Sequence, residues 1–139
     1  MHYYMQMNEI KVPISPGELL DKITILRIKS QRMTDPLKLK NVRVELAALE
    51  EVWKDSPYGR AGAAVAADID ALQRVNERLW VIEDDIREQE RRKDFGAEFV
   101  RLARAVYFEN DERAAIKRRI NLNLGSSIVE EKSYADYKA

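Results

Sequence analysis

The sequence predicts an all-α protein, an antiparallel bundle of four main helices with extended arms at both ends. Three observations predict this fold. Apolar residues recur at helical spacing along most of the chain, and helix-start and helix-end signals divide that pattern into four stretches. Charged residues make up 35% of the chain, which is typical of amphipathic helices with solvated outer faces. With 139 residues, the chain is long enough for one domain with its own core.

The domain is predicted to have three parts. Residues 1–14 form an N-terminal arm, residues 15–125 form the helical bundle, and residues 126–139 form a C-terminal tail. In the arm, Ile10, Val12 and Ile14 alternate with Lys11 and Pro13, which is typical of a short extended segment. Proline within that segment confines it to an edge.

The first helix is predicted to run from Ser15 to about Met33. Ser15 is a good N-cap, and Pro16 suits the first helical position. Glu18, three residues after the cap, completes a capping box. The apolar residues of this helix fall on two nearly opposite lines, so we expect neighbouring helices on both sides.

Three further helices complete the predicted bundle. A turn at Asp35-Pro36 precedes the second helix, roughly residues 37–54. The third helix is long, roughly residues 62–92, and the fourth returns after a tight connection to a C-cap at Gly125. The third and fourth helices should therefore form a long hairpin that extends beyond the shorter first one. A symmetric homodimer is the expected way to cover the overhang.

The charge balance argues against a nucleic-acid partner. Lysine and arginine total 24, as do aspartate and glutamate, so the formal net charge is zero. Nucleic-acid-binding domains normally carry a basic excess, whereas the one basic run, Lys117-Arg118-Arg119, lies near a helix end where the helix dipole favours cations. No run approaches the roughly 20 apolar residues that span a bilayer, and no secretory signal is visible.

The chain has no cysteine and a single histidine, His2. A thiolate metal site cannot form, and a histidine-based metal site or catalytic triad is not expected. Acidic residues over 83–88, with Glu109 and Asp111, raise the alternative of Mg²⁺. Pairing with nearby arginines on solvated helix faces explains them more simply. We therefore expect no metal and no cofactor, and a cytoplasmic location, which the lack of cysteine fits.

The fourth helix carries the candidate site. Its apolar stripe, from Phe99 to Leu124, is interrupted by Asn110, Arg113 and Lys117. At about 100° per residue, all three lie within roughly 40° of the stripe centre. Two cations and an amide thus occupy positions where a bundle helix normally buries aliphatic side chains. Because burying an unpaired charge is energetically unfavourable, a carboxylate, water or an anionic ligand must interact with these cations.

Residues of neighbouring helices are predicted to join these three in a polar island. Glu83 lies in the apolar stripe of the third helix. Its position along the predicted hairpin brings it towards Arg113, so we expect its carboxylate to pair with that cation. Asn76 lies in the same stripe. Asp21 and Arg27 lie among the apolar residues of the first helix.

The polar island has two interpretations. In one, Arg113 and Lys117 bind a carboxylate or phosphate, and Asn110 orients a hydroxyl. In the other, the island is a salt-bridge cluster that fixes helix register. Three classes of function remain. The leading hypothesis is a binding or accessory module for a small anionic ligand or an acidic partner segment. The alternatives are an enzyme acting on an anionic metabolite, with Glu83 as a weak candidate acid or base, and a purely structural or oligomerisation protein.

Three segments carry a resemblance that covers nearly the whole chain. They are residues 13–26 (PISPGELLDKITIL), 79–87 (LWVIEDDIR) and 110–134 (NDERAAIKRRINLNLGSSIVEEKSY). With them the chain resembles a bacterial family of domains of unknown function. The resemblance implies no catalytic residue. Some relatives resemble neighbours or fusions of cell-envelope glycosyltransferases, which suggests a link with polysaccharide synthesis.

A second similarity concerns pocket design alone. All-helical chorismate mutases use long helices, a dimer, and an internal pocket of arginine, lysine and glutamate, and the polar island is similar in kind. Their characteristic motif is not reproduced in this chain, so the similarity transfers no activity.

Overall fold

A computed structural model describes residues 8–137 of the chain. These residues form four α-helices and one short 3-10 helix, namely α2 (Pro16–Arg32), α3 (Pro36–Asp55), η1 (Gly59–Ala61), α4 (Gly62–Arg91) and α5 (Ala97–Asn123). The predicted all-α bundle is confirmed, and residues 8–137 contain no strand. Half of the predicted N-terminal arm, residues 1–7 with His2, lies outside the described residues. No helix in the described range is both long and apolar enough to cross a bilayer.

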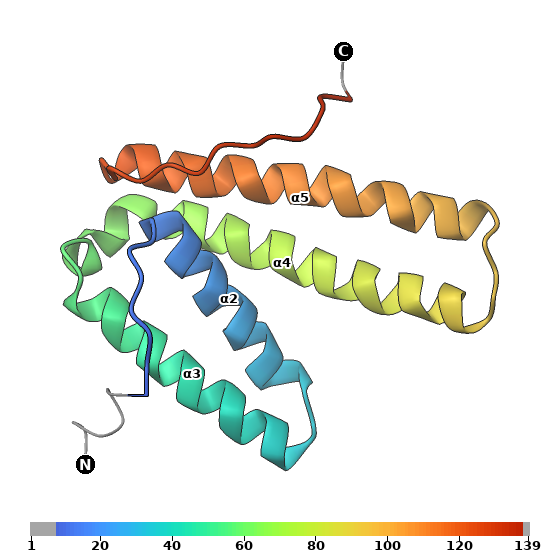
Figure 1. The fold of residues 1–139 in the computed structure, drawn as a ribbon, viewed down its shortest axis with the longest axis horizontal. Helices are drawn as coiled ribbons and strands as arrows, with labels where there is room; N and C mark the ends of the chain where they lie inside the picture. The colour runs from blue at the N-terminus through green and yellow to red at the C-terminus, as the bar shows by residue number, and fades with distance from the viewer. Residues whose placement is uncertain (1–7, 138–139) are drawn as a thin grey trace.

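The helices form two antiparallel hairpins of unequal length (Figure 1). α2 and α3 make the short hairpin, and α4 and α5 make the long one. α2 contacts α3, α4 and α5, so it is the central helix that its two apolar lines predicted. The C-terminal tail turns back after α5 and runs beside it (Figure 1).

The core lies where α2, α4 and α5 meet. A contiguous cluster of buried apolar side chains fills this region: Leu20, Val65, Leu72, Val75, Leu79, Ile116 and Ile120. Each such side chain contributes about 1.5–3 kcal/mol when fully buried. Trp53 of α3 packs against the edge of the cluster. All of α3 lies in the described range, and Val42 is its one buried residue, so α3 covers the core rather than forming it.

Local signals at the helix ends explain where the chain turns. Ser15 Oγ accepts a hydrogen bond from the backbone N–H of Glu18 at 3.1 Å, and Asp35 Oδ1 accepts from that of Leu37 at 2.9 Å. In both cases a proline follows the cap at the first helical position. After α5, Gly125 has a φ of 67°, the left-handed conformation that commonly ends a helix and favours glycine.

α4 ends in the same left-handed geometry but without a glycine. Lys93 has a φ of 56°, a conformation that costs an L residue about 1 kcal/mol. We expect Lys93→Gly to raise the free energy of unfolding by about 0.5–1 kcal/mol. Urea denaturation measures this change, with Gly125→Ala as the converse substitution that should lower stability. A Lys93→Gly variant less stable than the wild type would contradict the assignment.

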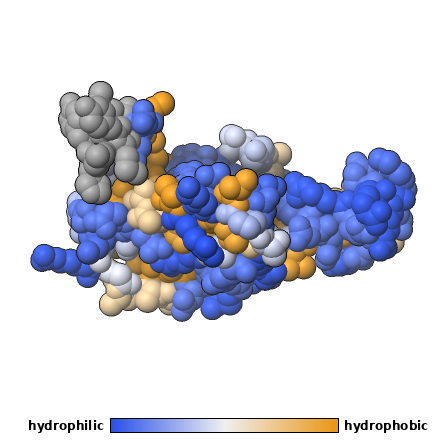
Figure 2. Space-filling view, turned by 90° about the horizontal axis from the view of Figure 1, so that it is seen from below, coloured by the Kyte–Doolittle hydropathy of each residue, from blue (hydrophilic) through white to orange (hydrophobic). Residues whose placement is uncertain are grey.

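The far half of the long hairpin has no buried core, and ion pairs within each helix line its surface. From residue 80 to residue 101, all within the described range, no residue is buried. Ion pairs one helical turn apart line this region: Glu83–Arg87, Glu88–Arg91 and Glu98–Arg101. Figure 2 shows a face on which this end of the molecule is predominantly hydrophilic. The homodimer stays a prediction, which sedimentation equilibrium would check.

Candidate functional site

Arg113 is held by amide oxygens rather than by a carboxylate. Its Nη1 donates to Asn76 Oδ1 at 3.1 Å, and its Nη2 donates to Asn110 Oδ1 at 2.9 Å. The Nδ2 of buried Asn76 donates in turn to Asp21 Oδ1 and Thr24 Oγ1, each at 2.9 Å. These bonds fix the amide so that its oxygen faces Arg113. No ion pair formed among residues 8–137 includes Arg113.

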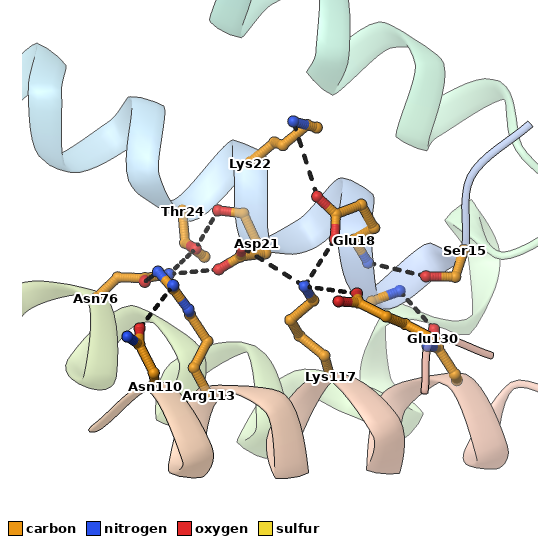
Figure 3. Close-up of polar contacts among 12 residues, drawn as sticks. Ser15, Glu18, Asp21, Lys22, Thr24, Asn76, Asn110, Arg113, Lys117 and Glu130 are labelled. Atoms are coloured by element: carbon orange, nitrogen blue, oxygen red, sulfur yellow. Dashed lines mark hydrogen bonds and ion pairs between the residues drawn. The ribbon is translucent and has the colours of Figure 1, made fainter. Parts of the chain in front are cut away.

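Lys117, one turn further along α5, has the opposite environment (Figure 3). Its Nζ lies 2.7 Å from Glu18 Oε2, 3.1 Å from Glu130 Oε2 and 4.0 Å from Asp21 Oδ2. The first and last of these carboxylates come from α2, and Glu130 comes from the C-terminal tail. The Lys117 side chain is only 14% exposed. The positive charge of Lys117 is therefore neutralised by carboxylates of the protein itself.

Burial and charge act in opposite directions on the two closest partners. Burial raises the pKa of the Glu18 carboxyl, but the hydrogen bond and charge of Lys117 outweigh burial and bring this pKa below its usual value. Burial lowers the pKa of Lys117, but hydrogen bonds to Glu18 and Glu130 outweigh it and raise that pKa. Both groups are thereby held in their charged forms.

The lowered pKa of Glu18 makes stability depend on pH. Its contribution is fully present above the unfolded pKa of 4.5 and is lost as the pH falls through the lower, folded value. We therefore expect the free energy of unfolding to decline below about pH 4.5, and Glu18→Gln to make that decline shallower. Urea denaturation at a series of acidic pH values measures both slopes. Equal slopes for the variant and the wild type would show that Glu18 has no part in the decline.

The first turn of α2 lies directly on α5. The backbone N–H of Gly17 donates to Asn121 Oδ1 at 2.7 Å, and Asn121 is 1% exposed. A Cβ atom on Gly17 would lie 2.6 Å from the carbonyl oxygen of Lys117 and 2.8 Å from Asn121 Oδ1. Only glycine allows this approach. The contact places Glu18 and Asp21, one and four positions further along the same helix, beside Lys117.

Arg113 and Asn110 line a hollow of about 360 Å³ between α2, α4 and α5. Four apolar side chains form part of its wall: Ile25, Ile28, Leu79 and Trp80. The remaining lining residues are polar or charged: Lys29, Asn76, Glu83, Asp84 and Arg87. A wall with apolar area and a few convergent polar groups is the usual composition of a small-molecule site. An organic anion would fit with its charged end against Arg113.

The structure corrects the prediction that Glu83 answers Arg113. Glu83 does line the hollow, but its Oε2 accepts from Arg87 at 2.5 Å. The hairpin register explains the difference, because Asn76 lies level with Arg113 and bonds to it. Glu83 lies seven positions further along α4, about 10 Å towards the hairpin end. Its nearest cation there is one turn away on its own helix.

Arg27 also does not join the polar island. It lies on the side of α2 that faces α3, where its Nε is 3.9 Å from Glu50 Oε1. A helix with neighbours on both sides has two packed faces, and the sequence pattern does not tell which face meets which neighbour. The other predicted members, Asp21 and Asn76, do lie beside Arg113 and Lys117.

Three residues that contact the polar island were not predicted from the sequence: Glu18, Thr24 and Glu130. The capping-box pattern assigned Glu18 to the helix start, but its carboxylate binds Lys117. Its spacing offered a signal, because residues three apart, such as Glu18 and Asp21, share one face of a helix. Glu130 lies beyond the end of α5, where helical spacing carries no information about neighbours.

Four of the acidic residues considered for a metal form ion pairs, namely Glu83, Glu88, Glu109 and Asp111. Glu88 pairs with Arg91, and Glu109 pairs with Arg78. Among residues 8–137, no three histidine or carboxylate side chains come together in a way that would hold a metal ion.

No protein-family model, no curated protein and no solved structure matches this chain.

Proposed function

We propose that this chain is a cytoplasmic binding module for a small organic anion, and that Arg113 receives the negative charge of the ligand. The environment of Arg113 carries the proposal. Its guanidinium is half-buried, oriented by two amide oxygens, and without an ion-pair partner among residues 8–137. A cluster that only fixes helix register neutralises its cations, as the carboxylates around Lys117 do. Arg113 has no such neutralisation.

The hollow supports a ligand with an anionic end and a flat or apolar part. Arginine suits carboxylates and phosphates because its planar N–H groups match their oxygens. Trp80 and the nearby isoleucine side chains offer apolar surface for the remainder of the ligand. The volume, about 360 Å³, is at the lower end for a small-molecule site. The bacterial-family resemblance makes nucleotide sugars of cell-envelope polysaccharide synthesis the first class to test.

Lys117 has a structural role in this proposal rather than a binding role. Three carboxylates surround it, so it has little charge left for a ligand. Of the two cations predicted to bind the ligand, this proposal therefore retains Arg113, and Asn110 and Asn76 are the residues that position its guanidinium. The enzyme alternative gains no support, because the carboxylate of Glu83 is bound to Arg87.

A thermal-shift panel tests the proposal. We expect at least one of inorganic phosphate, malonate and uridine diphosphate glucose to raise the melting temperature of the wild type. Arg113→Met should abolish the increase while folding normally, because no carboxylate loses its partner. Arg101→Met is the matched control, since Arg101 lies on the same helix in an exposed pair with Glu98. An increase retained by Arg113→Met, or no increase with any anion, would contradict the proposal.

A further inference from the structure

The C-terminal tail lies on α5 in a defined antiparallel register. Three ion pairs hold it there: Glu130–Lys117 at 3.1 Å, Glu131–Arg118 at 3.1 Å, and Lys132–Asp111. Further along, the Tyr137 ring packs edge-on against Tyr107 and Phe108, with centroid distances of 5.0 and 5.2 Å. α5 therefore presents a row of contacts that matches two acidic residues, a basic residue and an aromatic residue in an extended segment.

These contacts hold the tail at the surface. Residues 130–137 are all exposed, and the Glu131 side chain is 76% exposed. Surface ion pairs of this kind contribute little stability each and weaken with salt. A groove of about 690 Å³ lies between the tail and α5, with the small side chains of Ala114 and Ala115 in its wall. The tail therefore lies in the groove without filling it.

The surface of α5 beneath the tail is basic. Among the residues of this groove, α5 contributes the cations Arg113, Lys117 and Arg118 and the single carboxylate Asp111. The tail contributes the two carboxylates Glu130 and Glu131 and the cation Lys132, so its net negative charge offsets part of that excess. Charge complementarity thus selects an acidic occupant for the groove.

We infer that the groove along α5 is a docking site for an acidic, extended peptide segment of a partner protein. In this structure the chain's own residues 130–132 occupy the position that the partner segment would take. The partner segment would carry two consecutive carboxylates that meet Lys117 and Arg118, beside a basic residue that meets Asp111. Because the tail is tethered at Gly125, its local concentration is high, and a partner segment has to displace it. The inference does not rest on the proposed anion site, which uses the hollow on the α2 side of Arg113.

The test uses the full chain with its tail released. Glu130→Gln with Glu131→Gln removes both acidic contacts and leaves Lys117 its partners on α2. The probe is a fluorescein-labelled peptide with the sequence of residues 127–137, and fluorescence anisotropy measures its binding. We expect the released variant to bind the peptide at least about tenfold more tightly than the wild type, because its own tail loses two of its three ion pairs with α5 and competes less well for the groove. Added salt should weaken this binding.

Two matched controls decide specificity. A peptide with glutamine at both glutamate positions should bind at least about tenfold more weakly. Arg118→Gln in the released variant removes one exposed pair and should weaken binding about twofold. Circular dichroism shows whether each variant is folded. The inference is overturned by equal affinity of wild type and released variant, by equal binding of the glutamine peptide, or by no binding at all. Competition by inorganic tripolyphosphate as strong as that by unlabelled peptide would indicate an unselective basic surface and would also overturn it.

Discussion

Replacing Gly17 with alanine should lower the free energy of unfolding by about 3 kcal/mol. The added Cβ would lie 2.6 Å from the backbone carbonyl oxygen of Lys117, and neither helix can yield by moving a flexible side chain. Separating the helices would also break the hydrogen bond from the Gly17 N–H to Asn121 Oδ1, leaving a buried amide unsatisfied. Chemical denaturation followed by circular dichroism measures the loss.

Gly62→Ala is the matched control for this prediction. Gly62 begins α4, and a Cβ atom there would meet nothing within 4 Å. Alanine at that position should leave stability unchanged or raise it by up to about 1 kcal/mol, because it restricts the unfolded chain. Equal effects of the Gly17 and Gly62 substitutions would mean that α2 does not approach α5 as closely as described.

Replacing Lys117 with methionine should lower the free energy of unfolding by about 2–3 kcal/mol at neutral pH. Methionine keeps most of the apolar length of the side chain but leaves Glu18 and Asp21 without their shared cation. The expected loss lies below that of a fully sealed ion pair, because the Glu18 side chain is 29% exposed and Glu130 more so. The destabilisation should shrink in acid, where protonation removes the repulsion among the carboxylates.

Arg118→Met is the control for Lys117→Met on the neighbouring position of the same helix. Arg118 is half-exposed, and its partner Glu131 is exposed, so its loss should change stability by no more than about 0.5 kcal/mol. If the two substitutions destabilise the protein equally, Lys117 is not the buried centre of the cluster.

The helices could be predicted from the sequence because their signals are local. Ser15-Pro16 and Asp35-Pro36 each place a cap and a proline at a helix start, and α2 and α3 begin at those prolines. Gly125 ends α5 through its own left-handed conformation. The short helix η1 was not predicted. Gly59 within it lies so close to the end of α3 that a Cβ atom would be 2.4 Å from the Lys54 carbonyl oxygen, and such a contact has no local signal.

The site could be predicted only where it depends on the hairpin. Asn76, Asn110 and Arg113 come together because α4 and α5 are joined by a short turn that sets their register. The carboxylates around Lys117 depend on how α2 crosses that hairpin, which is a property of tertiary packing. Helical periodicity shows that α2 has two buried faces, but not which face meets α5. For that reason Glu18 was not predicted beside Lys117. Glu83 was predicted opposite Arg113, but the register of the α4–α5 hairpin places Asn76 there.

The central claim is that Arg113 binds an anion in the hollow beside Trp80. The most direct measurement follows the arginine Nε–H resonances of ¹⁵N-labelled protein by NMR while inorganic phosphate is added. The Arg113 signal is identified by its absence from the spectrum of Arg113→Met. We predict that this signal shifts and saturates at phosphate concentrations that leave the signal of Arg101 unmoved. An Arg113 signal that moves no more than that of Arg101 would contradict the claim.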